Sequence, residues 1–403
     1  MDFLEELRER KLVFDLSDEE KFLFALRNKK KIYLGIDPTA PSLHLGNYLG
    51  ITLLKRFIKA GYEVVVLLGE MTSAIGDPSF RVNERVSLSS EKIKENLKSI
   101  EREVKYLLPE AEIINNYSFY EQLSILNFVK EMCSCINVNH LLAKEFLKDR
   151  LNKGITLAEF VYPLFQSWDF LVLYSMKDVA VQLGGSDQWG NITVGIDLIR
   201  KKVGSNHIAS GLTFPLLLDS SGKKFGKSEN NALFLNKELT SPYSIYQYLL
   251  NLDDSLVPNL LKQLTFLELK EIEKLKGVIV MKNTLAFEIC KDIYGIRIAK
   301  KMESISSKLF SGKLEEDFDL IKGAIPTIEV TEAITFAQAL RALGLVSSNS
   351  EINRLVSSKG LFLFEEVVTT SDLVLTSESS NKGYFLLRKG KKNYALVHFT
   401  CWK

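Results

Sequence analysis

Two short stretches of this chain combine residues that can bind phosphate, and the first is HLGN. In it, His44 and Gly46 stand between a strand-like run and a helical run. A helix N-terminus presents free N–H groups and the positive end of the helix dipole, and Gly46 lets a ligand approach the backbone closely. His44 and the nearby Thr39 could then donate hydrogen bonds to a polyphosphate. The structural alternative is a histidine satisfied within its own turn.

The second stretch is SGKKFGKS at 221–228, where three lysines are interleaved with two glycines. It is not a P-loop, because the GxxxxGK[ST] spacing is absent. No GxGxxG fingerprint follows the first predicted strand either, which counts against a dehydrogenase. Alone, SGKKFGKS is typical of a solvated basic turn. Because HLGN is also present, we interpret SGKKFGKS as a second phosphate-binding segment.

Both stretches must be positioned by the elements around them. From residue 30 to about 200, the strand-like runs IYLGID, YEVVVLLG, EIINN and DVAVQLGG alternate with helical patterns at 47–60, about 89–107 and 187–199. This alternation predicts an α/β fold with a parallel sheet and helices on both faces. Such sheets bind ligands at the carboxyl ends of their strands, where Gly, Asp, Asn and Gln cluster in this chain.

The remainder of the chain differs in composition. Residues 240–325 are helical in pattern and rich in Lys and Glu. Around Pro326 the pattern changes to a small α+β module, in which TEAITFAQALRALGLV predicts one helix ending at Gly344. The final hairpin is expected to turn at RKGKKN.

Bulk composition excludes several classes of protein. The net charge is +2 over 403 residues, so the chain as a whole has no excess of basic charge that would indicate nucleic-acid binding. Such binding would depend on local basic patches. The four cysteines have neither metal-site nor disulfide spacing. The N-terminus has no apolar signal region, and no apolar run approaches membrane-spanning length. We expect a cytoplasmic protein with buried free thiols.

The ordered motifs identify a family. HLGN after the first strand and KFGKS after the last resemble the HIGH and KMSKS signatures of class I aminoacyl-tRNA synthetases. The flanking strings YLGIDPTAPSLHLGN, IGDPS and QLGGSDQWGNI look like bacterial tyrosyl-tRNA synthetases, over almost the whole chain. The resemblance implies a Rossmann-like parallel-sheet catalytic domain at 1–220. It further implies the KFGKS loop with an α-helical anticodon-binding domain at 221–325, and a small α+β S4-like RNA-binding domain at 333–403.

One helix pattern fits the substrate that the resemblance implies. Tyr162, Gln166 and Asp169 stand at i, i+4 and i+7 in EFVYPLFQSWDF, so they share one helix face among strongly apolar neighbours. Such polar groups need partners, unless the helix is half-polar and faces solvent. By resemblance, Tyr162 and Gln166 hold the α-amine of tyrosine together with Asp77. Asp169 and Tyr33 hydrogen-bond its phenol.

The resemblance also implies an adenylate site. Further contacts to the substrate backbone or to the nucleotide would come from Gln182, Gln188, Gly35, Gly185, Asp187, Asp37 and Asn47, the last replacing the final His of HIGH. Asp187 is also expected to cap a helix. In the implied reaction the tyrosine carboxylate attacks the α-phosphate of ATP, which arrives with Mg²⁺. Thr39, His44, Lys224 and Lys227 stabilise the leaving pyrophosphate, and no dedicated protein ligand set for a metal is evident. Arg81 and Arg85 either assist or are plain surface arginines.

Partners follow from the same resemblance. They are tRNA(Tyr), L-tyrosine, ATP and a second copy of the chain in a homodimer. Basic residues of the C-terminal module could contact tRNA phosphates, namely Arg354, Lys359, Arg388, Lys389, Lys391 and Lys392. Two alternatives stay open: a tryptophanyl-tRNA synthetase, and a non-catalytic RNA-binding relative. The intact His44, Lys224, Lys227 and Asp169 count against the second.

Overall fold

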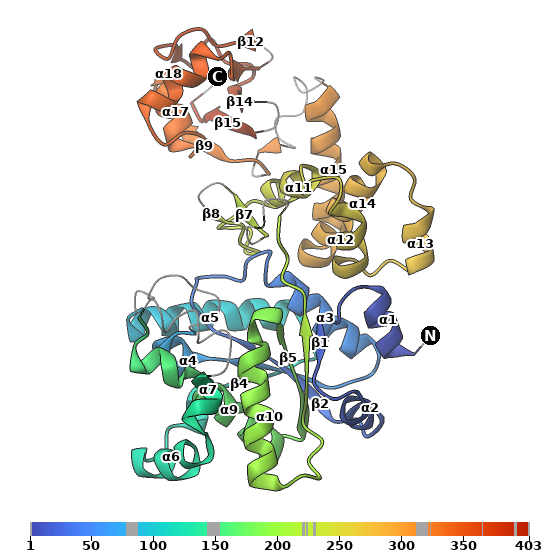
Figure 1. Cartoon of the computed structure of the whole chain (residues 1–403). Helices are drawn as coiled ribbons and strands as arrows, with labels where there is room; N and C mark the ends of the chain where they lie inside the picture. The colour runs from blue at the N-terminus through green and yellow to red at the C-terminus, as the bar shows by residue number, and fades with distance from the viewer. Residues whose placement is uncertain are drawn as a thin grey trace. The chain divides into compact units, whose positions relative to one another are not determined.

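The computed structural model describes residues 2–77, 88–142, 154–219, 222, 225–228, 231–311, 321–322, 324–364, 366–390 and 393–401. The chain forms two compact units, and Figure 1 shows its helices and strands coloured from blue at the N-terminus to red at the C-terminus. The first unit contains Met1–Asn236 and Pro258–Lys274, and the second contains Lys237–Val257 and Leu275–Lys403. Each unit has its own sheet and is described separately.

The first unit is built on a six-stranded sheet in the order β1-β6-β5-β2-β3-β4. Its strands are β1 (Asp15–Leu16), β2 (Lys31–Ile36), β3 (Val64–Leu68), β4 (Glu112–Asn115), β5 (Val179–Gly185) and β6 (Ser210–Phe214). All neighbouring pairs are parallel except β1 with β6. The predicted parallel sheet is confirmed. The edge strand β1 and the strand β6 were not predicted.

Helices cover both faces of this sheet (Figure 1). Helix α3 (Tyr48–Lys59) lies on the face of Leu34, whose side chain is against Gly50. Helices α9 (Leu157–Met176) and α10 (Trp189–Val203) pack together on the opposite face, where the ring of Phe170 contacts Tyr33. Helix α5 (Ser90–Leu107) packs beside β3. The shorter helices of the unit are α1 (Phe3–Glu9), α2 (Glu19–Arg27), α4 (Glu70–Ile75), α6 (Ile125–Glu131), α7 (Val138–Leu142), α12 (Val257–Leu264) and α13 (Leu269–Lys274).

The start of α9 is fixed by its sequence. The Thr156 hydroxyl accepts a hydrogen bond from the Glu159 N–H, and the Glu159 carboxylate accepts one from the Thr156 N–H, which makes a capping box. The helix then runs through Tyr162, Gln166 and Asp169, so the predicted spacing on one helix face is confirmed. This face lies toward the sheet.

The second unit contains a helical part and a C-terminal α+β module. The helices are α11 (Pro242–Leu250), α14 (Val278–Tyr294) and α15 (Ile296–Ser311). In the module, β9 (Thr327–Val330), β11 (Leu361–Leu363), β12 (Glu366–Val367), β14 (Tyr384–Lys389) and β15 (Asn393–Phe399) form a sheet in the order β12-β11-β14-β15-β9. Helices α17 (Phe336–Ala342) and α18 (Asn349–Ser357) share its apolar core.

The predicted start of one helix in this module is wrong. Residues Ile334 and Thr335 form strand β10, which pairs with β13 (Val374–Leu375), and only then does α17 begin. The reason is local: Thr335 is the N-cap of α17 and forms a capping box with Gln338. Among the described residues, no helix is both long and apolar enough to cross a membrane.

Candidate active site

The centre of the site is a pair of buried side chains on adjacent strands. Tyr33 of β2 pairs with Gln182 of β5, so both side chains share the face covered by α9. Tyr33 is 1% exposed, and its ring centroid lies 5.3 Å from that of Phe170. Neither the Tyr33 hydroxyl nor Gln182 Oε1 has a hydrogen-bond partner among the described residues. Buried polar groups without partners are rare, and a polar ligand could supply the missing partners for both of these groups.

The carboxyl of Asp169 lies beside this pair. Its Oδ2 accepts a hydrogen bond of 3.0 Å from Asn116 Nδ2, and its Oδ1 accepts one of 2.8 Å from the Tyr120 hydroxyl. Asp169 is 3% exposed, and burial raises the pKa of its carboxyl to about 8 despite these two bonds. Burial, and secondly the nearby Asp169, raise the pKa of Tyr33 well above its ordinary value. Tyr33 therefore keeps its hydroxyl proton.

A second carboxylate, Asp37, follows β2. Its Oδ2 accepts from the Tyr162 hydroxyl at 3.0 Å, and its Oδ1 accepts from Thr72 Oγ1 at 2.7 Å. Asn116 Nδ2 lies 3.3 Å from Thr72 Oγ1, so a continuous network joins Asp169 to Asp37. A Cβ at Gly69 would stand 2.1 Å from Asp37 Oδ1, so only glycine at this position leaves room for the Asp37 carboxylate.

A third group of polar side chains lies at the start of α10. Gln188 Nε2 donates a 2.7 Å hydrogen bond to Asp77 Oδ2. Asn191 Nδ2 lies 3.1 Å from Gln166 Oε1 and 3.2 Å from Gln188 Oε1. The structure thus brings together Asp77 and Gln166, which the resemblance assigned to the α-amine, and Gln188, which it assigned to the substrate backbone or the adenylate. Asn191 joins them and was not predicted.

Glycines open the carboxyl ends of β2 and β5. A Cβ at Gly35 would meet no described atom within 4 Å, which leaves space above the strand. A Cβ at Gly185 would stand 2.6 Å from Asp187 Oδ1. Asp187 lies within a 3-10 turn (Ser186–Gln188), and α10 begins after Gln188. The expectation that Asp187 caps this helix is wrong, because the chain makes this tighter turn before α10 starts.

The two predicted phosphate-binding stretches meet in space. Leu45 N–H donates to the Leu233 carbonyl at 2.8 Å, and Leu233 N–H donates to the Gly226 carbonyl at 2.7 Å. Gly226 has φ 78°, and a Cβ on it would lie 2.9 Å from Leu45 Cβ and 3.2 Å from Gly46 N. Glycine at 226 is therefore required by both conformation and space. Strand β7 (Lys227–Ser228), which contains Lys227, pairs with β8 (Asn231–Ala232) just beyond.

The HLGN segment is held from several sides. Asn47 Oδ1 accepts from His44 N–H at 3.0 Å, and Thr39 N–H donates to the Asp37 carbonyl at 2.8 Å. From α5, Glu103 Oε2 accepts from Leu43 N–H at 2.9 Å, and Asn96 Nδ2 donates to the Pro38 carbonyl at 3.1 Å. Burial raises the pKa of Glu103 against these bonds. No motif indicated Glu103 or Asn96, because they act from a distant, charged helix.

Some predicted residues are not tested by the geometry. Arg81, Arg85 and Lys224 lie outside the described residues. Among the residues that are described, no group of three or more His, Cys, Asp or Glu could hold a metal ion.

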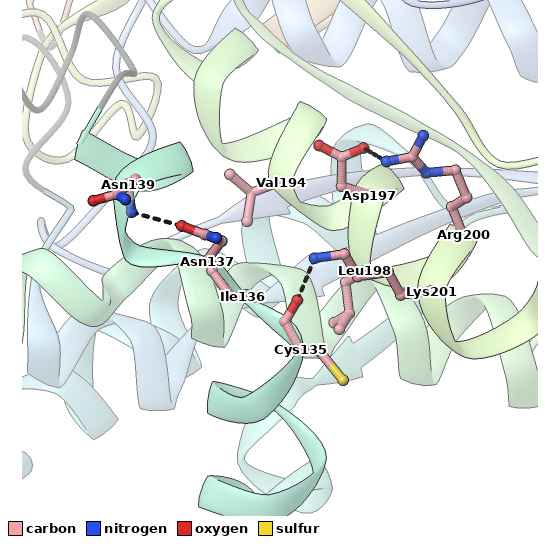
Figure 2. A pocket seen from close by; sticks show the side chains of 9 residues that line it. All are labelled: Cys135, Ile136, Asn137, Asn139, Val194, Asp197, Leu198, Arg200 and Lys201. Carbon is pink, nitrogen blue, oxygen red and sulfur yellow. Dashed lines mark hydrogen bonds and ion pairs between the residues drawn. The ribbon is translucent and has the colours of Figure 1, made fainter.

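A cavity of about 440 Å³ opens elsewhere in the first unit (Figure 2). It lies between α10 and the segment around Cys135, where Lys201 Nζ bonds the Cys135 carbonyl and Asp197 pairs with Arg200. None of the candidate site residues lines this cavity. It is therefore separate from the polar network described above.

The parallel sheet, the polar network at its carboxyl edge and the contact between the HLGN and FGKS segments are the architecture of a class I synthetase. A family model described as tRNA synthetases class I (W and Y) matches residues 26–311, and the chain belongs to this family. It is 38% identical to the tyrosine–tRNA ligase of Mycoplasma mobile, covering 98% of this chain and 99% of that relative. It is 40% identical to the tyrosine–tRNA ligase of Phytoplasma mali, covering 99% and 100%.

Solved structures agree with this assignment. A C-terminally truncated mitochondrial tyrosyl-tRNA synthetase from Aspergillus nidulans superposes with a TM-score of 0.69 at 29% identity, covering 76% of this chain and 94% of that one. An Archaeoglobus fulgidus tyrosyl-tRNA synthetase, at 17% identity and a TM-score of 0.58, shares the fold. The two tyrosine–tRNA ligases and the Aspergillus nidulans structure favour the tyrosine branch of the family over the tryptophan branch.

Proposed function

We propose that the chain is a tyrosine–tRNA ligase. It activates tyrosine with ATP to tyrosyl-adenylate and pyrophosphate, and then transfers tyrosine to the 3′ end of tRNA(Tyr). The observation that carries this proposal is the buried pairing of Tyr33 and Asp169. The Tyr33 hydroxyl has no partner among the described residues, and the Asp169 carboxyl lies next to it.

The phenol of tyrosine complements this pair. Its oxygen can accept from the Tyr33 hydroxyl, and its proton can be donated to Asp169. Phenylalanine would leave the buried Tyr33 hydroxyl without a partner and would leave Asp169 with only its bonds to Asn116 and Tyr120. A buried polar group left unpaired costs on the order of 1–3 kcal/mol. Tryptophan has no hydroxyl at this position and a larger ring.

The amine end of the substrate would meet the second and third polar groups. Asp77, Tyr162 and Gln166 supply a carboxylate, a hydroxyl and an amide, and such groups suit a charged α-amine. Gln182 and Gln188 would contact the substrate backbone or the adenylate. With the phenol and the amine both held, the α-carboxylate would extend toward the open space at Gly35.

The nucleotide would occupy that open space. Its ribose and adenine side would pass Gly35, Gly185 and Asp187, with Asp37 near the reacting centre. His44, Thr39 and Asn47, with Lys224 and Lys227, would hold the phosphates. Because Asn47 Oδ1 accepts from His44 N–H within the turn, its NH₂ group is the part suited to a phosphate oxygen. Arg81 and Arg85 are further candidates for the pyrophosphate.

The chemistry requires positioning rather than a covalent enzyme intermediate. The tyrosine carboxylate attacks the α-phosphate of ATP, which enters as its Mg²⁺ complex, and pyrophosphate leaves. The basic and N–H groups of the joined HLGN and KFGKS segments would stabilise the charge that develops on the leaving phosphates.

The domain roles complete the proposal. We assign 1–220 to catalysis, 221–325 to the KFGKS loop and anticodon side, and 333–403 to RNA binding. In the C-terminal module Arg354 and Lys359 are exposed. Lys389 Nζ instead bonds Glu351 Oε1 at 2.8 Å and the Leu345 carbonyl at 2.9 Å, so it is partly used within the module. Lys391 and Lys392 lie outside the described residues.

A homodimer and a cytoplasmic location belong to the same proposal. The apolar side chains of α6 support the dimer: Ile125 is 84% exposed and Leu126 61%, with Val129 also exposed. Val138 of α7 adds to this apolar surface. A second copy of the chain would remove these side chains from water.

The test is amino-acid-dependent ATP–pyrophosphate exchange without tRNA, comparing tyrosine, phenylalanine and tryptophan. Exchange with tyrosine alone is the expected result. Exchange with tryptophan would instead assign the chain to the tryptophanyl-tRNA synthetases. No exchange with any of the three, in folded protein, would favour a non-catalytic RNA-binding relative.

A further inference from the structure

Asp169 can select a phenol only if its carboxyl is oriented and able to accept a proton. Its two oxygens are held by different partners. Asn116 contacts Oδ2, and the hydroxyl of Tyr120 contacts Oδ1 at 2.8 Å. Tyr120 comes from the loop between the 3-10 turn Asn116–Phe119 and α6, not from the sheet or from α9. No motif of the sequence indicated it.

The Tyr120 hydroxyl has one proton and two acceptors within reach. Besides Asp169 Oδ1, the Phe165 carbonyl lies 3.0 Å from it. When Asp169 is ionised, the proton belongs on Oδ1, because a hydrogen bond to a charged acceptor is the stronger one. When Asp169 is protonated, the carboxyl can donate to the Tyr120 oxygen and Tyr120 can donate to Phe165. The hydroxyl thus adapts to both states and stabilises the ionised one more.

The surroundings of Asp169 otherwise oppose ionisation. The titratable groups that face it are Tyr33 from β2, Asp37 after β2, Tyr162 from α9 and Tyr120 itself. Burial and the charge of Asp37 raise the pKa of Asp169, while Asn116 and Tyr120 lower it. Tyr120 is therefore one of two neutral donors that limit the rise in the pKa of Asp169 and favour its ionised form.

We propose that Tyr120 is a positioning residue for amino-acid selection, which holds the Asp169 carboxylate ready to accept the hydrogen bond of the substrate phenol. This inference rests on the proposed function. The remaining lone pair of Oδ1 or Oδ2 receives the phenol proton, and the Tyr33 hydroxyl donates to the phenol oxygen. Tyr120 acts through Asp169 and does not touch the substrate.

The variant Tyr120→Phe tests this role. It keeps the ring, whose centroid lies 5.7 Å from that of Phe165, and removes only the hydroxyl. Tyr117→Phe is the matched control, because Tyr117 belongs to the same turn and is exposed. For each protein, kcat/KM in pyrophosphate exchange is measured with tyrosine and with phenylalanine between pH 6 and 9, using wild type as reference.

The expected result has two parts. Tyr120→Phe should lose about tenfold in kcat/KM for tyrosine, with phenylalanine nearly unchanged, so the preference for tyrosine falls by about tenfold. The acid limb of the tyrosine pH profile should also move to higher pH, because a bond that favoured the ionised carboxyl is gone. The ratio of kcat/KM for tyrosine to kcat/KM for phenylalanine does not depend on the fraction of active protein in a preparation. Partial misfolding therefore cannot produce this change in the ratio.

Other outcomes would overturn the inference. Equal losses for both amino acids with an unmoved pH profile would make Tyr120 a purely structural residue. An unchanged ratio, or the same change in Tyr117→Phe, would also reject it. Failure of wild type to use tyrosine would instead reject the proposed function, so the two failures are distinguishable.

Discussion

The hydroxyl of Tyr162 lies 3.0 Å from Oδ2 of Asp37, to which it donates a hydrogen bond across 125 residues of sequence. Burial, and then the charges of Asp37 and Asp77, raise the pKa of Tyr162 well above its ordinary value, so this hydroxyl remains a donor. Asp37 is thus held by α9 as well as by Thr72 of α4. The contact therefore joins Tyr162, at the amine-binding end of the proposed site, to Asp37, near its reacting centre.

Tyr162→Phe should therefore weaken tyrosine activation. Removing the donor leaves Asp37 Oδ2 without this partner, and it removes a ligand for the α-amine. A loss of about tenfold in kcat/KM for tyrosine is expected, while the melting temperature should fall by only a few degrees. Tyr106→Phe, at an exposed position of α5, is the control. Equal activities of the two variants would argue against the contact having a role in activation.

Two glycine variants should separate packing from ligand binding. Gly69→Ala places a methyl group 2.1 Å from Asp37 Oδ1, so the carboxylate must move, and tyrosine exchange should fall by at least tenfold even at saturating ATP. Gly35→Ala meets no described atom within 4 Å. Its free energy of unfolding should change by less than about 0.5 kcal/mol, while KM for ATP rises. A Gly35→Ala protein with normal KM for ATP would place the nucleotide elsewhere.

Asp169 should make stability depend on pH. Its folded-state pKa is about 8, above the ordinary value of 3.8. Between these values the folded protein keeps a proton that the unfolded chain has released, so the free energy of unfolding falls as pH rises from 4 to 8. Asp169→Asn cannot titrate. The stability difference, wild type minus variant, should therefore decrease by more than about 1 kcal/mol from pH 5 to 8 in urea unfolding. Parallel curves would mean that the buried carboxyl stays ionised.

Removal of residues 327–403 should leave amino-acid activation intact. The core of the C-terminal module is formed from side chains between Ile328 and Phe399, so it can be removed as a whole together with β9. Pyrophosphate exchange should stay within about twofold of wild type, while tRNA charging falls by at least tenfold. If exchange were also abolished, in protein that circular dichroism shows to be folded, separate roles for the two parts would be rejected.

Sequence patterns predicted the regular part of the fold and site. Continuous apolar runs such as VVVLL identified central strands, and the 162, 166 and 169 spacing placed three polar groups on one face of α9. Strand β6 was missed because SGLTF is short and contains Gly211, whose missing side chain makes room for Ile192.

The supporting residues of the site were also missed. Gly69 and Thr72 belong to the start of α4, whereas Asn116 and Tyr120 belong to the 3-10 turn after β4 or directly follow it, and no spacing along the chain relates the two segments. Their role depends on tertiary contacts that only the folded chain makes. The domain boundaries and the roles of the individual site residues stay predictions.

The network from Asp169 through Asn116 and Thr72 to Asp37 is complete before any substrate arrives. On the proposed function, the geometry that tells tyrosine from phenylalanine is therefore a product of folding and is not assembled by the substrate. The accuracy with which tyrosine is attached to tRNA would then depend on the structure of the site before the substrate binds. Mutations that loosen this scaffold without touching the amino acid would introduce translation errors before they abolished growth.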